Sequence, residues 1–88
     1  MGAVLISRND VAVSNPGLAA RIEEALARAV ARSPRAFRAS VEAGRGERIA
    51  RVWLEEHPSG DGSTRREASL DLTLDVVGLR RTIDSLLR

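Results

Sequence analysis

Seven arginine side chains are the groups in this 88-residue chain whose type and spacing could do chemistry. Arginine stays charged at physiological pH, and its planar guanidinium group donates paired hydrogen bonds to a phosphate. These residues fall in or just after two segments predicted to be helices: Arg21, Arg28, Arg32 and Arg35 in the first, and Arg80, Arg81 and Arg88 in the second. Two such helices side by side would border a basic groove able to follow a phosphate backbone.

The same arginines also fit an ordinary charged helix surface. Arg80, Asp84 and Arg88 are spaced four apart, and Glu24 lies one helical turn before Arg28, so opposite charges can pair on neighbouring turns. The net charge is only +2, and all 14 cationic residues are arginine, a bias that a GC-rich genome also produces. Charge alone therefore leaves phosphate binding and a solvated surface both open.

Trp53 is the second candidate, because it lies on a predicted strand among alternating residues. It shares one strand face with Ile49 and Arg51, and this face should point away from the helices. A tryptophan there could stack on a base, anchor a protein interface, or be shielded by Arg51 and cross-strand neighbours. The adjacent Ile49 favours an open sheet face used for self-association.

Residues for catalysis or metal binding do not come together in the sequence. The chain has no Cys, Lys or Tyr, and its one histidine, His57, lies in a polar loop where an exposed side chain is expected. Adjacent carboxylates at 23–24 and 55–56 point in different directions on regular structure. The Gly-Asp-Gly-Ser run at 60–63 lacks the lysine of a phosphate-binding loop. We expect a non-enzymatic protein with no catalytic residue, metal, cofactor or small-molecule substrate.

Periodicity predicts the elements that position these side chains. Strands are expected at 4–6 together with 11–13, at 37–43, at 47–56 and at 68–75; helices are expected at 16–32, after an N-cap at Asn15, and from 79 onward. The order is β-α-β-β-β-α, and the short connections between the last three strands predict an antiparallel meander.

Each predicted helix has a single apolar stripe, so both helices should cover the same face of a four-stranded sheet. This arrangement is a two-layer α+β sandwich, and the length fits one domain over residues 1–88. No apolar run approaches the roughly 20 residues of a membrane span, and the first residues lack the basic region of a signal peptide. Together with the absence of cysteine, this favours a cytoplasmic protein without a membrane partner.

Three segments carry a family resemblance. Residues 6–14 read Ile-Ser-Arg-Asn-Asp-Val-Ala-Val-Ser ahead of an amphipathic helix, Leu18, Ile22 and Leu26 are four apart, and residues 82–86 read Thr-Ile-Asp-Ser-Leu. With the β-α-β-β-β-α order, this resembles the ribosome hibernation-promoting factors, also called ribosome-associated inhibitors or sigma-54 modulation proteins. Their first strand has the form I-S-G-R-N-hydrophobic-x-V-T, and their last helix contains Ala-Ile-Asp-x-Leu.

The resemblance implies a fold like that of double-stranded-RNA-binding domains. It also implies a stress-response factor that represses translation by occupying the RNA channel of the small ribosomal subunit. The residues implied are Arg21, Arg28 and Arg32 on the first helix and Arg80, Arg81 and Arg88 on the second. The chain departs from the family at Arg8 and Asn9, at Glu24 and Ala25, and where family members continue with a basic tail after the position of Arg88. The alternative is a protein-interaction module that forms a homodimer through the sheet face around Trp53.

Overall fold

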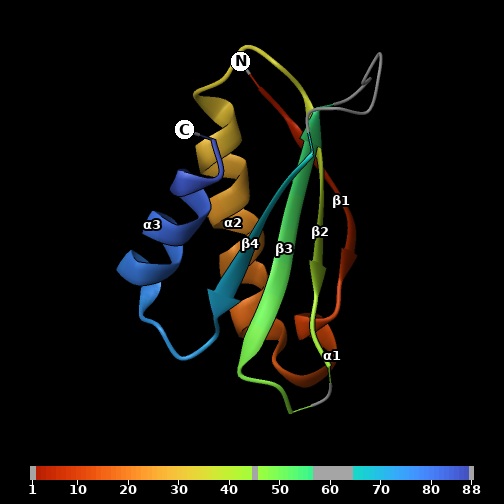
Figure 1. The fold of residues 1–88 in the computed structure, drawn as a ribbon, viewed down its shortest axis with the longest axis vertical. Helices are drawn as coiled ribbons and strands as arrows, with labels where there is room; N and C mark the ends of the chain where they lie inside the picture. The colour runs from red at the N-terminus through yellow and green to blue at the C-terminus, as the bar shows by residue number, and fades with distance from the viewer. Residues whose placement is uncertain (1, 45, 57–64, 88) are drawn as a thin grey trace.

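A computed structural model of the chain describes residues 2–44, 46–56 and 65–87. Its elements are β1 (Val4–Asn9), α1 (Val11–Ser14), α2 (Pro16–Ala31), β2 (Phe37–Glu42), β3 (Ile49–Glu56), β4 (Arg66–Asp71) and α3 (Val76–Ser85). The strands form one sheet, and α2 and α3 pack beside each other against one of its faces (Figure 1). The predicted two-layer α+β sandwich is confirmed.

The sheet has the order β1-β2-β3-β4. Strand β1 runs parallel to β2, starting from the pair Val4 and Phe37, because the crossover helix α2 returns the chain to the same end of the sheet. Strands β2, β3 and β4 are antiparallel neighbours, as predicted for the meander. Residues 43–48 connect β2 to β3, and residue 45 of the tight connection predicted at 44–46 lies outside the described residues.

The core lies between the helices and the inner face of the sheet. The apolar stripes of both helices are buried there, as predicted, except that Leu18 and Leu87 are only partly buried. The largest fully buried side chains come from both layers: Ile22, Leu26 and Val30 from α2, Ile83 from α3, and Val41, Val52, Leu54 and Leu70 from the strands. One shared core therefore fixes where the outer faces of the two helices point.

The prediction that 11–13 belongs to the first strand is wrong, because these residues form the one-turn helix α1. A β-bulge at Ser7 shifts the register, so that Arg8 pairs with Ser40 and Asn9 turns inward beside Val41. The chain then leaves the sheet at the next residue. A run as short as Val-Ala-Val fits both the two-residue period of a strand and the roughly 3.6-residue period of a helix.

The prediction that the last strand continues to residue 75 is also wrong, since β4 ends at Asp71. The Asp71 carboxylate accepts hydrogen bonds from the hydroxyl and backbone N–H of Thr73, which closes a turn and lowers the pKa of Asp71. Asp75 then caps α3 by accepting from the Gly78 N–H, so this helix begins at Val76. Asn15 caps α2 by accepting from the Leu18 N–H at 3.1 Å, as predicted.

Candidate nucleic-acid interface

One side of α2 carries three arginines and faces α3. Arg21, Arg28 and Arg32 are separated by seven and four residues, so helical periodicity places them on one side of the helix. Arg32 Nη1 lies 4.0 Å from Asp84 Oδ2 on α3, which identifies this side as the one turned toward α3. Three of the predicted site residues therefore share one border of the α2–α3 groove, the surface between the outer edges of these two helices.

The opposite side of α2 is held against β1. The side-chain amide of Asn9 donates to Glu23 Oε2 at 2.9 Å and to the Ala19 carbonyl at 3.3 Å. Asn9 reaches this position because the bulge turns it toward the helices. With one side bonded to β1 and the core stripe buried, α2 cannot rotate about its axis, and its arginine side stays toward α3.

Helix α3 provides the other border of the groove. Arg80 lies one turn before Asp84, so both residues share the side of α3 that faces α2. The two helices run in the same direction (Figure 1), and Arg28 lies one turn before Arg32 just as Arg80 lies one turn before Asp84. Arg28 and Arg80 are therefore placed across the groove from each other. Arg81 projects into solvent farther round α3.

Few carboxylates neutralise these guanidinium groups. Arg28 pairs with Glu24 at 3.0 Å, as the alternative of an ordinary charged surface predicts, but both side chains are more than half exposed. Such an exposed pair contributes only about 0.3–0.5 kcal/mol and yields readily to a phosphate. Among the described residues, no ion pair joins Arg21, Arg80 or Arg81 to an acidic side chain. Arg88 lies outside the described residues.

A pocket of about 430 Å³ is lined by residues at the C-terminal ends of α2 and α3, and we call it the end pocket. Both helix ends lie at the top of Figure 1. Arg32 and Arg35 line the pocket from the connection between α2 and β2, and Arg66 lines it from the start of β4. Arg35 pairs with Glu56, and Arg66 donates to the Leu86 carbonyl at 2.8 Å. Arg66 is not among the residues predicted from the sequence. Its alternation with Ala68 and Leu70 was the available signal, since it puts Arg66 on the strand face that packs against the helices.

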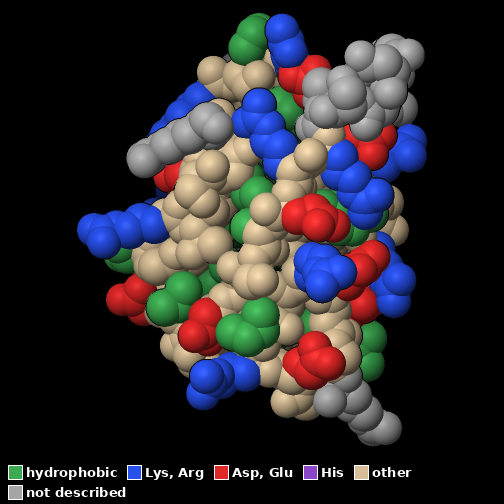
Figure 2. Space-filling view, in the orientation of Figure 1, with side chains coloured by type: hydrophobic (Ala, Val, Ile, Leu, Met, Phe, Trp, Pro, Cys, Tyr) green, Lys and Arg blue, Asp and Glu red, His purple; other side chains and the backbone are tan. Residues whose placement is uncertain are grey.

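The outer face of the sheet carries alternating charges. Arg38 lies opposite Glu55, and Glu42 lies opposite Arg51, on neighbouring strands. Figure 2 shows acidic and basic side chains interspersed over β3 and β4. Among the described residues, the outer sheet face has no row of positively charged side chains comparable to the arginine side of α2.

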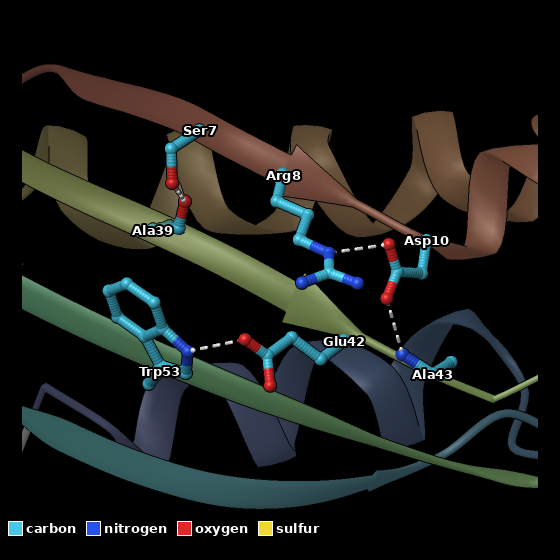
Figure 3. A network of polar contacts seen from close by, with 7 residues as sticks. All are labelled: Ser7, Arg8, Asp10, Ala39, Glu42, Ala43 and Trp53. Atoms are coloured by element: carbon cyan, nitrogen blue, oxygen red, sulfur yellow. Dashed lines mark hydrogen bonds and ion pairs between the residues drawn. The ribbon is translucent and has the colours of Figure 1, made fainter.

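Trp53 lies on this outer face, as predicted, but it is partly covered. Its indole Nε1 donates to Glu42 Oε1 at 3.4 Å (Figure 3), and the Arg65 guanidinium stacks over its ring at 4.1 Å from the centroid. Ile49 is 43% exposed on the same face. Cross-strand shielding, one of the three alternatives for Trp53, is the one that the contacts support; the shielding group is Arg65 rather than Arg51.

Asp10 joins β1 to the end of β2 on the same side of the sheet (Figure 3). It pairs with Arg8 at 2.7 Å and accepts from the Ala43 N–H at 3.2 Å. The hydrogen bond from Arg8 lowers the pKa of Asp10, and it raises that of Arg8. Because the folded state lowers the pKa of Asp10, the ionised carboxylate stabilises the fold when the pH is above the pKa of an ordinary aspartate. This contribution is lost as the pH falls through the lowered pKa of the folded state.

His57 and the 60–63 run lie outside the described residues. Within 2–44, 46–56 and 65–87, no three acidic or histidine side chains form a metal-binding group, and no helix has the length and apolar character needed to cross a membrane. Neither the models of known protein families nor the curated proteins include a match to this chain. The resemblance to the hibernation-promoting factors therefore stays a prediction.

Proposed function

We propose that this protein binds RNA through the α2–α3 groove and acts as a ribosome-associated factor that represses or protects idle ribosomes. The contact between Arg32 and Asp84 carries the proposal, because it identifies the arginine side of α2 as the side that faces α3. Guanidinium groups from both helices then border one groove. The small ribosomal subunit is the proposed partner, and the cytoplasm is the proposed location.

The distribution of charge supports this choice of surface. The surface formed by α2 and α3 carries five arginines, four that border the groove (Arg21, Arg28, Arg32 and Arg80) and Arg81 farther round α3, against the carboxylates of Glu24 and Asp84. The outer sheet face has acidic residues opposite or beside its arginines. A phosphate backbone is attracted to the surface with unbalanced positive charge, which is the groove.

Self-association through the sheet face is the second candidate function. Leu5 and Ile49 favour it, because they are 58% and 43% exposed on that face. The stacking of Arg65 on Trp53 makes it the weaker candidate, since a partner would first have to displace a charged side chain from the ring.

Binding to small ribosomal subunits should depend steeply on salt. Neutralising about five phosphates gives a slope of log K against log salt of roughly −3.5 to −4.5, so affinity should fall roughly 100- to 500-fold between 50 and 200 mM salt. Sedimentation of the purified protein with small subunits across a salt series measures this slope. The two-layer fold should remain intact throughout, which circular dichroism of the free protein checks.

An absence of co-sedimentation at low salt would remove the ribosome as the partner. Binding that is insensitive to salt would instead contradict the arginine groove, because phosphate contacts release counterions.

A further inference from the structure

We infer that the end pocket binds a phosphate monoester, the doubly charged group found at the 5′ end of an RNA strand or on a free nucleotide. The inference rests on the proposed function, because the pocket shares Arg32 and Asp84 with the α2–α3 groove. It adds a ligand and a residue, Arg66, that the groove alone does not involve.

Hydrogen-bond donors in the pocket are available to such a ligand. Arg32 Nη1 lies 4.0 Å from Asp84 Oδ2, which is beyond hydrogen-bonding distance, and the Arg32 side chain is 79% exposed. Arg66 uses Nη1 to bond the Leu86 carbonyl, and a guanidinium group has five N–H donors. Arg35 forms an ion pair with Glu56 that is shorter than the contact between Arg32 and Asp84, so its guanidinium group is less available to a ligand. Arg32 and Arg66 are therefore the two residues best able to hold phosphate oxygens.

The charge of the pocket selects a monoester over a diester. Three arginines line it against the two carboxylates of Glu56 and Asp84, so the lining is net positive and its attraction for a ligand grows with the negative charge of that ligand. A phosphate monoester offers three acceptor oxygens and about −1.5 to −2 charges at neutral pH, whereas a diester carries one charge. The position where α2 and α3 end also suits the end of a strand lying along the groove.

Asp84 opposes binding of the phosphate. It faces Arg32 without a close hydrogen bond, so it repels an incoming phosphate while holding the guanidinium group only weakly. Asp84→Asn removes the repulsion and leaves Arg32 fully available. We expect this substitution to strengthen binding of the monoester severalfold and binding of a diester less, because the repulsion that it removes grows with the charge of the ligand.

Two RNAs of one sequence test the pocket, one with a 5′-phosphate and one with a 5′-hydroxyl, both labelled at the 3′ end. A 5′-hydroxyl RNA two nucleotides longer carries the same total charge as the phosphorylated one and serves as the charge control. In fluorescence anisotropy at fixed salt, the phosphorylated RNA should bind about tenfold more tightly than this control. Arg32→Gln and Arg66→Gln should each bring this ratio close to one.

Arg21→Gln is the matched variant, because Arg21 lies on the same side of α2 but three turns before the pocket. It should weaken all three RNAs equally and leave the ratio unchanged. Arg66→Gln also removes the bond to Leu86, so Arg32→Gln, on an exposed side chain, is the decisive variant. Competition by a nucleoside monophosphate against the phosphorylated RNA distinguishes the two sources of the monoester.

The outcomes separate the inference from the proposed function. If the phosphorylated RNA and its charge control bind equally and with the expected salt slope, the pocket inference is overturned and the groove stands. If no RNA binds but a nucleoside monophosphate raises the melting temperature of wild type and not of Arg32→Gln, the pocket stands and RNA binding falls.

Discussion

Replacing Leu26 with Ala should remove a large part of the stability of the protein. Leu26 is fully buried between α2 and the sheet, and truncating such a leucine costs about 2.7–5 kcal/mol in lost transfer energy and cavity formation. A domain of this size has a total free energy of unfolding of roughly 4–13 kcal/mol. The expected result is a fall in melting temperature of more than about 10 °C, measured by circular dichroism, with a matching fall in urea midpoint.

Leu5→Ala is the matched control, because it makes the same chemical change on an exposed position of β1. Its free energy of unfolding should change by no more than about 0.5 kcal/mol. Equal effects of the two substitutions would mean that the core does not lie between α2 and the sheet.

Charge reversal across the groove should abolish most RNA binding. Arg28→Glu with Arg80→Glu removes two facing guanidinium groups and replaces each with a charge that repels phosphate. Each lost charged hydrogen bond is worth about 1.5–3 kcal/mol, so affinity for the small subunit should fall on the order of 100-fold or more. The salt slope should become shallower by about two, one for each phosphate contact. Co-sedimentation across the salt series measures both effects.

Arg38→Glu with Arg51→Glu gives a protein of the same net charge, altered on the outer sheet face instead. This control should keep most of its affinity. Equal losses in the two double variants would show that total charge, and not the groove, governs binding. Circular dichroism should show both variants folded, because the substituted residues lie outside the core.

Much of the architecture follows from patterns that a sequence displays directly. Only a strand buries the alternating residues Phe37, Ala39 and Val41 on one face, and only a helix buries the apolar stripe of α2. Both predictions are confirmed. The caps at Asn15 and the end of α2 before Pro34 are local chemistry, and a short window of sequence contains them. A short window of sequence does not predict that the arginine side of α2 faces α3, because this orientation depends on how the two helices pack.

The errors occur where tertiary contacts override a short pattern. Residues 11–13 alternate over too few positions to decide between strand and helix, and the bulge at Ser7 brings the chain out of the sheet before them. Asp71 ends β4 by bonding Thr73, although the leucine alternation continues beyond it. Arg66 meets Leu86 only because the end of α3 lies against the start of β4, a contact between residues 20 positions apart in the sequence.

The stacking of Arg65 on Trp53 has a spectroscopic consequence. Trp53 is the one tryptophan in the chain, and it lies on the layer opposite the α2–α3 groove. Its fluorescence should therefore change when the protein unfolds or when a partner displaces Arg65 from the sheet face. RNA bound in the groove should leave the emission unchanged. This intrinsic signal thus distinguishes the two proposed surfaces. A shift in tryptophan emission at rising protein concentration indicates self-association through the sheet, whereas RNA binding that anisotropy detects without any change in this emission indicates the helices.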